Sequence, residues 1–390
     1  MYNEINDLQG KINGKTVAIR IDANVPIVNG KITDDSRLAE ALPSIKFLLQ
    51  ENVSRIFILS HFGRPKGAER KPEFSLIQIK ERLEELLEQK IGFTSNFKAE
   101  TSEKIILCEN LRYDEREEKG DESFAAELSE IAEIYINDAF SCAHRPHASI
   151  SVVGKFTKIY AGFLMLKEIQ SIESILMKKE GKVLSIVGGS KVSTKIDLLK
   201  NLIHKMDYIF IAGGMANTFL YAKGLNVGAS LCEKDFKEVA LSILAEAEKS
   251  NCKIILPKDV IVCKKIEKSA SSRMVLNTEV LSDDIIVDAG NLALEDLKNV
   301  LQECSLFVWN GPLGIFEISP FGTSTFAFAR TVAKFTQDGK LKSIIGGGDT
   351  SSAILEAGLK EQMTYISTAG GAFLEWLEGK SLPGVMAVLK

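Results

Sequence analysis

The sequence predicts an α/β protein built from two doubly wound, Rossmann-like domains with parallel sheets. Short apolar runs alternate with amphipathic helical segments along the whole chain of 390 residues, which is typical of parallel sheets covered by helices. The residues that follow the apolar runs change from arginine-rich clusters in the first half to glycine turns in the second. Together with the length, this change favours two domains.

The first half predicts four strands and two helices. The apolar runs at 16–21, 55–59, 104–108 and 134–136 are expected to be strands, and 37–49 and 75–89 are expected to be helices. Pro43 predicts a kink, or an early stop and restart, in the first helix. The charged segment 114–122 predicts an exposed loop.

Polar residues gather where these strands end. In parallel sheets, ligands bind beyond the carboxyl ends of the strands, and this edge carries Asp22, Asn24, His61, Arg64, Arg112 and Arg145, with Arg37 one loop later. Guanidinium groups bind phosphate and carboxylate in a fork geometry. Their convergence predicts a multiply anionic ligand, while the alternative that each arginine is an ordinary surface residue stays open.

The second half repeats the strand pattern with glycine turns. Apolar runs at 183–187, 208–211, 306–309 and 343–345 lead to Gly188-Gly189, Gly213-Gly214, Gly311 and Gly346-Gly347-Gly348. Runs at 254–256 and 260–262 add strands whose arrangement the sequence leaves open, and a helical pattern at 161–179 is the expected connector. Four glycine turns at strand ends indicate a nucleotide site.

The last glycine turn predicts an anion site at a helix N-terminus. A strand, three glycines and the start of a helix bring bare N–H groups close to a ligand. Asp349 beside them suits Mg²⁺, which takes one or two carboxylates plus phosphate oxygens, or it is simply the N-cap of the helix. Lys191 and Lys195 share a face if the helix after Gly189 includes both, so they face phosphate or form an ordinary surface pair.

The composition argues against several other classes. A net charge of −4 gives no electrostatic reason to expect nucleic acid or an anionic membrane as a partner. Six scattered cysteines without a Cys-x-x-Cys pair, and a polar N-terminus, are typical of a reduced cytoplasmic protein without a signal peptide. There is no Walker A motif, no kinase His-Arg-Asp loop and no dinucleotide fingerprint after a predicted strand.

Taken together, the motifs resemble phosphoglycerate kinase along essentially the whole chain. The resemblance rests on 20–26, 60–65, 109–112, 137–145, 188–192, 213–215, 309–314, 346–350, 367–372 and 382–385. The chain departs from the family pattern at Ala23 (usually Phe), Ser141-Cys142 (usually Gly-Thr), Ser190 (usually Ala) and Ala369 (usually Gly). None of these departures removes a charged residue that the family uses.

The resemblance implies a triose-substrate domain at 1–165, a connecting helix at 166–180, a nucleotide domain at 181–374, and a tail at 375–390 that packs back on the first domain. It implies that 3-phosphoglycerate or 1,3-bisphosphoglycerate is bound by Asp22, Asn24, Arg37, His61, Phe62, Gly63, Arg64, Arg112 and Arg145. ADP or ATP would be bound by Gly189, Lys195, Gly213, Asn310, Glu317, Gly347, Gly348, Asp349 and Thr350, with Mg²⁺ on Asp349. Arg37, Lys191 and Lys195 would stabilise the phosphoryl group in transfer.

The expected reaction is reversible phosphoryl transfer from 1,3-bisphosphoglycerate to ADP in a cytoplasmic monomer that closes about a hinge. Since the group released by the sugar acid is a carboxylate, no general base is needed. Two alternatives remain at this point: an oxidoreductase that uses a nucleotide cofactor, and an anion-binding protein without catalytic activity.

Overall fold

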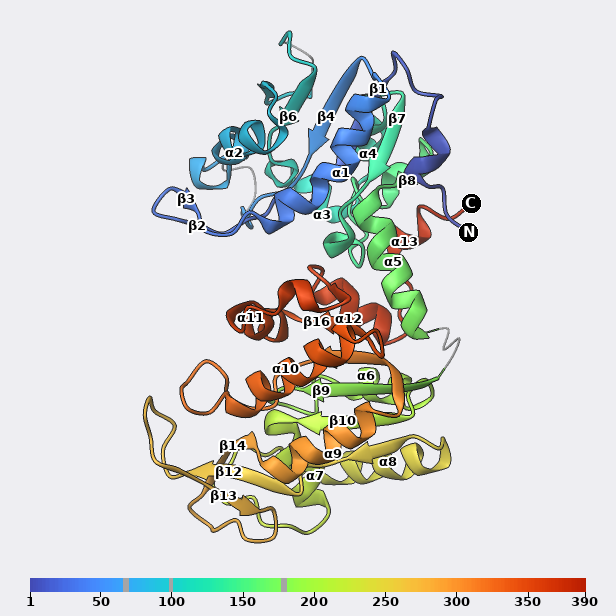
Figure 1. The fold of residues 1–390 in the computed structure, drawn as a ribbon. Coiled ribbons are helices and arrows are strands. Elements are labelled where there is room, and N and C mark those ends of the chain that lie inside the picture. Colours follow the sequence, from blue (N-terminus) through green and yellow to red (C-terminus); the bar gives the residue numbers. More distant parts are fainter. Residues whose placement is uncertain (66–69, 98–100, 177–180) are drawn as a thin grey trace. The chain divides into compact units, whose positions relative to one another are not determined.

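The computed structural model describes residues 1–65, 70–97, 101–176 and 181–390. These fall into two compact units, Met1–Gln170 with Ser381–Lys390, and Ser171–Lys380 (Figure 1). Residues 177–180 of the expected connecting helix lie outside the described residues. Residues 375–380, which we expected with the first unit, belong to the second, where the Asn201 side chain donates a hydrogen bond to the Leu377 carbonyl.

The first unit is built on a parallel six-stranded sheet in the order β5-β6-β4-β1-β7-β8. Its strands are β1 (Thr16–Arg20), β4 (Arg55–Leu59), β5 (Ile91–Thr94), β6 (Ile105–Cys108), β7 (Ile134–Asn137) and β8 (Ile159–Ala161), with a small hairpin of β2 (Ile27–Val28) and β3 (Lys31–Ile32). Its central strands are buried on both faces, which explains their continuous apolar runs.

Helices cover this sheet on both faces (Figure 1). They are α1 (Ser36–Gln50), α2 (Ile77–Leu87), α3 (Glu115–Lys119), α4 (Glu122–Ser129), α5 (Phe163–Leu176), which runs past the end of the unit, and α13 (Pro383–Met386). The two chain ends meet here, because the Asn3 amide donates to the Val388 carbonyl at 2.8 Å.

Two local expectations are wrong. Helix α1 does not stop at Pro43. Proline removes only one hydrogen bond, and buried residues on both sides of it, among them Leu38 and Ile45, keep the helix packed on the sheet. Segment 114–122 is not an exposed loop but contains α3, and Glu117 in its centre is fully buried.

The second unit has its own parallel six-stranded sheet, in the order β11-β10-β9-β15-β16-β17. The strands are β9 (Lys182–Gly188), β10 (Tyr208–Ala212), β11 (Lys253–Ile255), β15 (Cys304–Asn310), β16 (Lys342–Gly346) and β17 (Tyr365–Ile366). A separate antiparallel sheet, β13-β12-β14, comprises β12 (Asp259–Cys263), β13 (Ser272–Leu276) and β14 (Ile285–Ala289). The sequence left open that 254–256 and 260–262 belong to different sheets.

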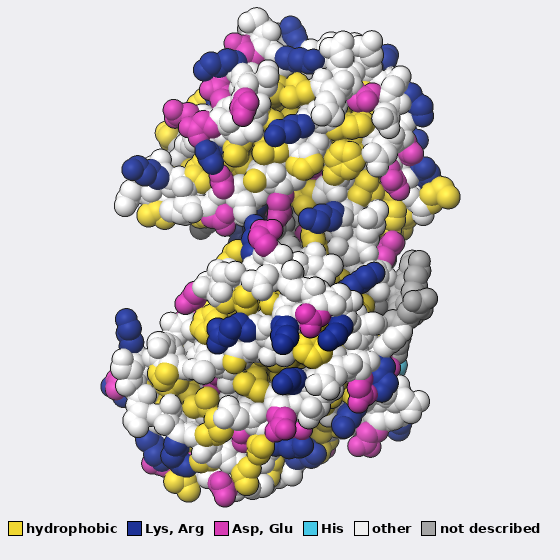
Figure 2. Space-filling model, viewed as in Figure 1, with side chains coloured by type: hydrophobic (Ala, Val, Ile, Leu, Met, Phe, Trp, Pro, Cys, Tyr) yellow, Lys and Arg dark blue, Asp and Glu magenta, His cyan; other side chains and the backbone are white. Residues whose placement is uncertain are grey.

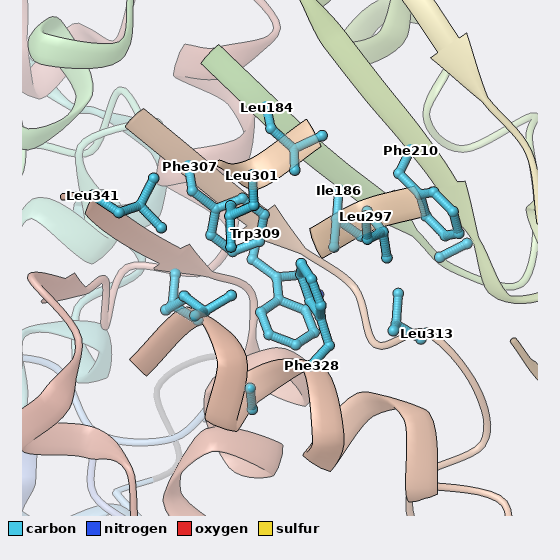
Figure 3. Packing of buried hydrophobic residues seen from close by; sticks show 14 of the residues in the cluster. Leu184, Ile186, Phe210, Leu297, Leu301, Phe307, Trp309, Leu313, Phe328 and Leu341 are labelled. Carbon is cyan, nitrogen blue, oxygen red and sulfur yellow. The ribbon is translucent and has the colours of Figure 1, made fainter. Parts of the chain in front are cut away.

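The helices of this unit are α6 (Ile196–Ile203), α7 (Gly213–Ala222), α8 (Lys237–Lys249), α9 (Asn291–Leu301), α10 (Thr323–Gln337), α11 (Gly348–Glu356) and α12 (Gly371–Leu377). Part of its core is an aromatic cluster in which Phe307, Trp309 and Phe328 pack edge to face, with ring centroids 5.5–5.8 Å apart (Figure 3). This cluster fixes β15 against α10, and Asn310 follows directly at the strand end.

The surface agrees with the near-neutral charge balance. Basic and acidic side chains are interspersed over the visible face of each unit (Figure 2). All six cysteines are free thiols, and five of them are buried. Within the described residues, the helices are too short or too polar to cross a bilayer.

Candidate active site

In the first unit, Asp22 is the hub of the polar residues at the carboxyl edge of the sheet. One carboxylate oxygen accepts hydrogen bonds from Arg37 Nη1 at 2.8 Å and from Ser141 Oγ at 2.5 Å, and the other accepts the Asn24 amide at 3.0 Å. Burial raises the pKa of Asp22, but the attraction of His61 and Arg37 and these hydrogen bonds outweigh it, so the pKa is lowered overall. Asp22 is therefore an ionised acceptor.

A second set of hydrogen bonds ties the loop after β4 to the same edge. Asn24 Oδ1 accepts the Gly63 amide at 2.8 Å, and the Gly63 carbonyl accepts Arg112 Nη1 at 2.7 Å. Gly63 has φ +60, and a Cβ there would lie 2.4 Å from the Phe74 ring. Only glycine fits at this position, so the loop is held tightly against Asn24 and Arg112.

His61 is held by a buried guanidinium. Arg20, the last residue of β1, is 1% exposed, and its Nη2 lies 3.1 Å from His61 Nδ1. Because arginine only donates, Nδ1 must accept, and the proton of the neutral ring is on Nε2. Arg20 Nε donates to Ser149 Oγ at 3.0 Å, and that hydroxyl donates to the buried Glu117. Glu117 is thus the counter-charge of this buried cation.

The ring of His61 is neutral for physical reasons. Burial lowers its pKa well below the usual value, Asp22 opposes this shift, and the positive charges of Arg20, Arg112 and Arg37 add to it. The same electrostatic contacts show that Arg20, Arg37 and Arg112 converge on His61.

The other predicted residues of this edge are less constrained. Phe62 is buried, and its amide donates to Asn110 Oδ1 at 3.1 Å. Arg145 is half-buried, donates to His144 Nε2 at 3.2 Å, and acts electrostatically on Arg112. Arg64 is exposed and follows Gly63. The structure therefore brings Asp22, Asn24, Arg37, His61, Gly63 and Arg112 together, with Arg145 close by.

In the second unit, glycine turns at the ends of β9 and β15 touch each other. A Cβ on Gly311, which has φ +98, would lie 2.4 Å from the Gly188 carbonyl carbon. Gly213 has φ +63, and its Cβ would lie 3.0 Å from the Gly189 oxygen. These approaches require glycine and leave the strand ends as bare backbone.

Lys195 crosses this glycine surface. Its Nζ donates to the Gly188 carbonyl at 2.8 Å and to the Asn310 side-chain oxygen. Burial lowers the pKa of Lys195 to about 8, against the opposing charges of Asp349 and Glu378. Asn310 Nδ2 in turn donates to the Gly346 carbonyl at 2.9 Å, so Lys195 is fixed between two strand ends.

The last turn closes the arrangement. Gly347 has φ +92, and a Cβ there would lie 2.7 Å from Asn310 Nδ2. Thr350 Oγ1 accepts the Gly311 amide at 2.7 Å. Gly348 and Asp349 lie in the first turn of α11, and Asp349 is exposed. Lys195, Asn310, Gly347 and Thr350 are thus linked, as the sequence predicts.

A mostly apolar cavity of about 360 Å³ opens beside these turns. Its walls include Phe210, Leu313 and Val287, with Gly189, Gly213, Glu317 and Asp349 also among the lining residues. The cavity has the size and character of a small-molecule site.

Lys191 stands apart from Lys195. Helix α6 begins only at Ile196, so neither lysine is inside it and the condition for a shared helical face is not met. Lys191 is exposed and is one of the charges acting on Glu233.

Three residues that order the site were not among those predicted to form it: Arg20, Asn110 and Ser141. A charged residue closing an apolar strand was the available signal for Arg20. Asn110 accepts from the amides of Phe62 and Arg112 and donates to the Phe62 carbonyl. No sequence signal connects Ser141 to Asp22, which lies 119 residues earlier.

Two Rossmann-like units, with guanidinium groups at the strand ends of one and glycine turns at those of the other, define a phosphoryl-transfer enzyme. The family model for phosphoglycerate kinase matches residues 5–380. The phosphoglycerate kinases of Zymomonas mobilis and Agrobacterium fabrum are 43% and 45% identical, over 99% and 98% of both chains. The solved structure of phosphoglycerate kinase from Coxiella burnetii, 38% identical, superimposes with a TM-score of 0.93 and covers 100% of this chain and 99% of its own.

The chain belongs to the phosphoglycerate kinase family. Its activity is the reversible transfer of a phosphoryl group between 1,3-bisphosphoglycerate and ADP, a step of glycolysis. The oxidoreductase and the non-catalytic alternatives are therefore set aside, and the α/β fold with two Rossmann-like sheets is confirmed.

The neutral state of His61 predicts a pH-dependent stability. The unfolded chain takes up a proton near pH 6.5, whereas the folded ring excludes it. This contribution is present above pH 6.5 and is lost as the pH falls, at up to about 1.4 kcal/mol per pH unit. Urea unfolding between pH 7.5 and 5.5 should show a smaller loss of stability for His61→Gln than for the unaltered chain, by about 1 kcal/mol.

His204→Gln is the control, since His204 lies at the surface with a side chain 57% exposed. Identical pH dependence of the unaltered chain and His61→Gln would contradict a neutral His61.

Proposed function

We propose that the guanidinium edge of the first unit binds 3-phosphoglycerate or 1,3-bisphosphoglycerate, and that the glycine turns and cavity of the second bind ADP or ATP. The observation that carries this assignment is the contrast in composition. Three arginines act on His61 in the first unit, as a ligand with two anionic ends requires. An apolar cavity beside bare amides and Lys195 suits a base joined to phosphates.

In the first unit, each residue has a proposed role. Arg37, Arg64, Arg112 and Arg145 neutralise the phosphate and carboxylate groups. His61 donates from Nε2, and Asp22 and Asn24 accept from the hydroxyl. Phe62 and Gly63 shape the loop that carries His61 and Arg64. The support is the ionised state of Asp22 and the acceptor state of Nδ1 described above.

In the second unit, Gly189, Gly213, Gly347, Gly348 and Thr350 surround the phosphates, and Glu317 meets the ribose. Asn310 holds Lys195. Asp349 is the proposed Mg²⁺ ligand, which fits because it is an exposed carboxylate beside the phosphate turn, and Mg²⁺ takes few protein carboxylates when phosphate oxygens are present. When bound, Mg²⁺ would offset phosphate charge.

The catalysis is proposed to be positioning and charge stabilisation. The group that leaves the acyl phosphate is a carboxylate, ionised near neutral pH, so no residue has to remove a proton. Arg37, Lys191 and Lys195 would stabilise the negative charge of the phosphoryl group in transfer. Arg37 is bound to Asp22 by one nitrogen only, which leaves its remaining donors for the ligand.

Replacing Arg37 by Ala should lower kcat by about a hundredfold or more, beyond any change in KM, because a transition-state contact is lost. The measurement is steady-state turnover of ATP with 3-phosphoglycerate in a coupled assay. Arg55→Ala, at the opposite end of β4, should stay near the unaltered rate. A kcat for Arg37→Ala within threefold of the unaltered chain, with the fold intact, would refute the role.

Lys195 should give the nucleotide reaction a basic limb. With a pKa of about 8, it is a cation below that pH and loses its charge above it, so kcat/KM for ATP should fall as the pH rises through about 8. Lys195→Arg keeps the charge and should move this limb upward by at least one pH unit, even if its rate is lower. A flat profile between pH 7 and 9.5 in the unaltered chain would exclude this role.

The proposal also includes hinge closure, because substrates bound in two units must meet for direct transfer. Small-angle scattering should show a smaller radius of gyration with both ligands than with either alone. Equal radii in all states would count against closure. A cytoplasmic monomer is the accompanying proposal, supported by the free thiols and the family.

A further inference from the structure

We propose that Asn217 selects the nucleotide base, favouring one that carries an amino group over one that carries a carbonyl oxygen at the same position. This inference rests on the proposed assignment of the cavity in the second unit to the base. It names a residue that neither the sequence motifs nor the family pattern singled out.

Asn217 lies one turn into α7 and lines the cavity. It is only 2% exposed. Its Nδ2 donates to the Leu231 carbonyl at 3.1 Å, and because a backbone carbonyl can only accept, this contact fixes which end of the amide is nitrogen. The other end, Oδ1, is buried and has no hydrogen-bond partner.

The rest of the lining makes this oxygen stand out. The cavity walls are mostly aliphatic or aromatic, and the other buried polar side chain, Asp288, has both oxygens engaged by the amides of Ala289 and Ser324 at 2.9 Å. Among the described lining residues, Asn217 Oδ1 is the one buried side-chain polar atom without a partner. A buried acceptor without a donor is unfavourable, so a ligand N–H would be bound selectively there.

The chemistry of the purines then decides the preference. Adenine carries an amino group, a donor, where guanine carries a carbonyl oxygen, an acceptor. Hypoxanthine has the same carbonyl oxygen without the second amino group of guanine. Against Asn217 Oδ1, adenine forms a hydrogen bond, whereas a 6-oxo purine places two acceptors against each other. ATP and ITP therefore form the cleanest pair of probes, since ribose and phosphates are identical.

The experiment compares kcat/KM for ATP and ITP, with 3-phosphoglycerate saturating. The unaltered chain should prefer ATP by at least about tenfold, in the range expected when a site built to hydrogen-bond one group meets an analogue lacking it. Asn217→Leu, similar in size but without an acceptor, should bring the ratio to within about threefold, and Asn217→Ala should do the same if the leucine disturbs packing.

Thr218→Val is the matched control. Thr218 is the next residue of α7, is fully buried, and bonds the Glu233 amide outside the cavity lining. It should keep the ATP/ITP ratio of the unaltered chain. An unaltered chain that does not discriminate, or a ratio that survives in Asn217→Leu and Asn217→Ala, would overturn the proposal.

Failure of the underlying assignment is recognised separately. Ile286→Trp fills the cavity from a half-buried position, and should raise KM for both nucleotides by a similar factor without changing their ratio. If it leaves both KM values unchanged in a folded protein, the cavity is not the base site. If it raises both while the Asn217 variants keep the ATP preference, the cavity assignment stands and only the role of Asn217 fails.

Discussion

A cation withdrawn from water at the carboxyl edge of a parallel sheet is the constraint around which each site is organised. Arg20 in the first unit is fully buried and is satisfied by Ser149, the Ile21 carbonyl and His61 Nδ1. A buried charge without such partners is strongly destabilising. Meeting this requirement sets the ring of His61 in one tautomer, so the group that a ligand would meet is a consequence of how the arginine is buried.

Lys195 poses the same problem in the second unit and is solved differently. Its amino group is held by a strand-end carbonyl and by Asn310, and Asn310 is itself locked by the Gly346 carbonyl. These bonds form only because the turns after β9, β15 and β16 approach each other at distances that exclude a Cβ at Gly311 and Gly347. The glycines therefore do more than expose amides: they let the anchor of the lysine reach across two strands.

The sequence was sufficient for the architecture and for most of the site, because both depend on short-range patterns. Strand 55–59 is found at Arg55–Leu59, and the polar residues after each strand lie at one sheet edge, as parallel strands require. The short edge strands β5 and β8 were missed, since four and three residues carry little periodicity. Segment 114–122 was misread because Glu117 looks like part of a solvated charge run, although it is buried against Ser149.

The contacts that could not be predicted are those between residues far apart in the chain. Ser141 bonds Asp22 across 119 residues, and Ser149 bonds Arg20 across 129. The orientation of the Asn217 amide depends on the Leu231 carbonyl, which belongs to a loop after α7. Each of these contacts decides the state of a functional group, an ionised carboxylate, a neutral ring or a free acceptor, and residue type alone leaves that state open.

The chemistry of the reaction explains why such fixed states suffice. Transfer to or from a carboxylate requires no proton to be removed, so a histidine at this site need not titrate, and burial that holds His61 neutral has no catalytic cost. The phosphoryl group in transfer instead requires charges that do not reorganise. Guanidinium groups held by Asp22, and a lysine held by Asn310, provide these because their partners are already in place before a ligand binds. The low pKa of Lys195 is the consequence of that arrangement, since the burial that holds the amino group rigid also weakens its hold on the proton.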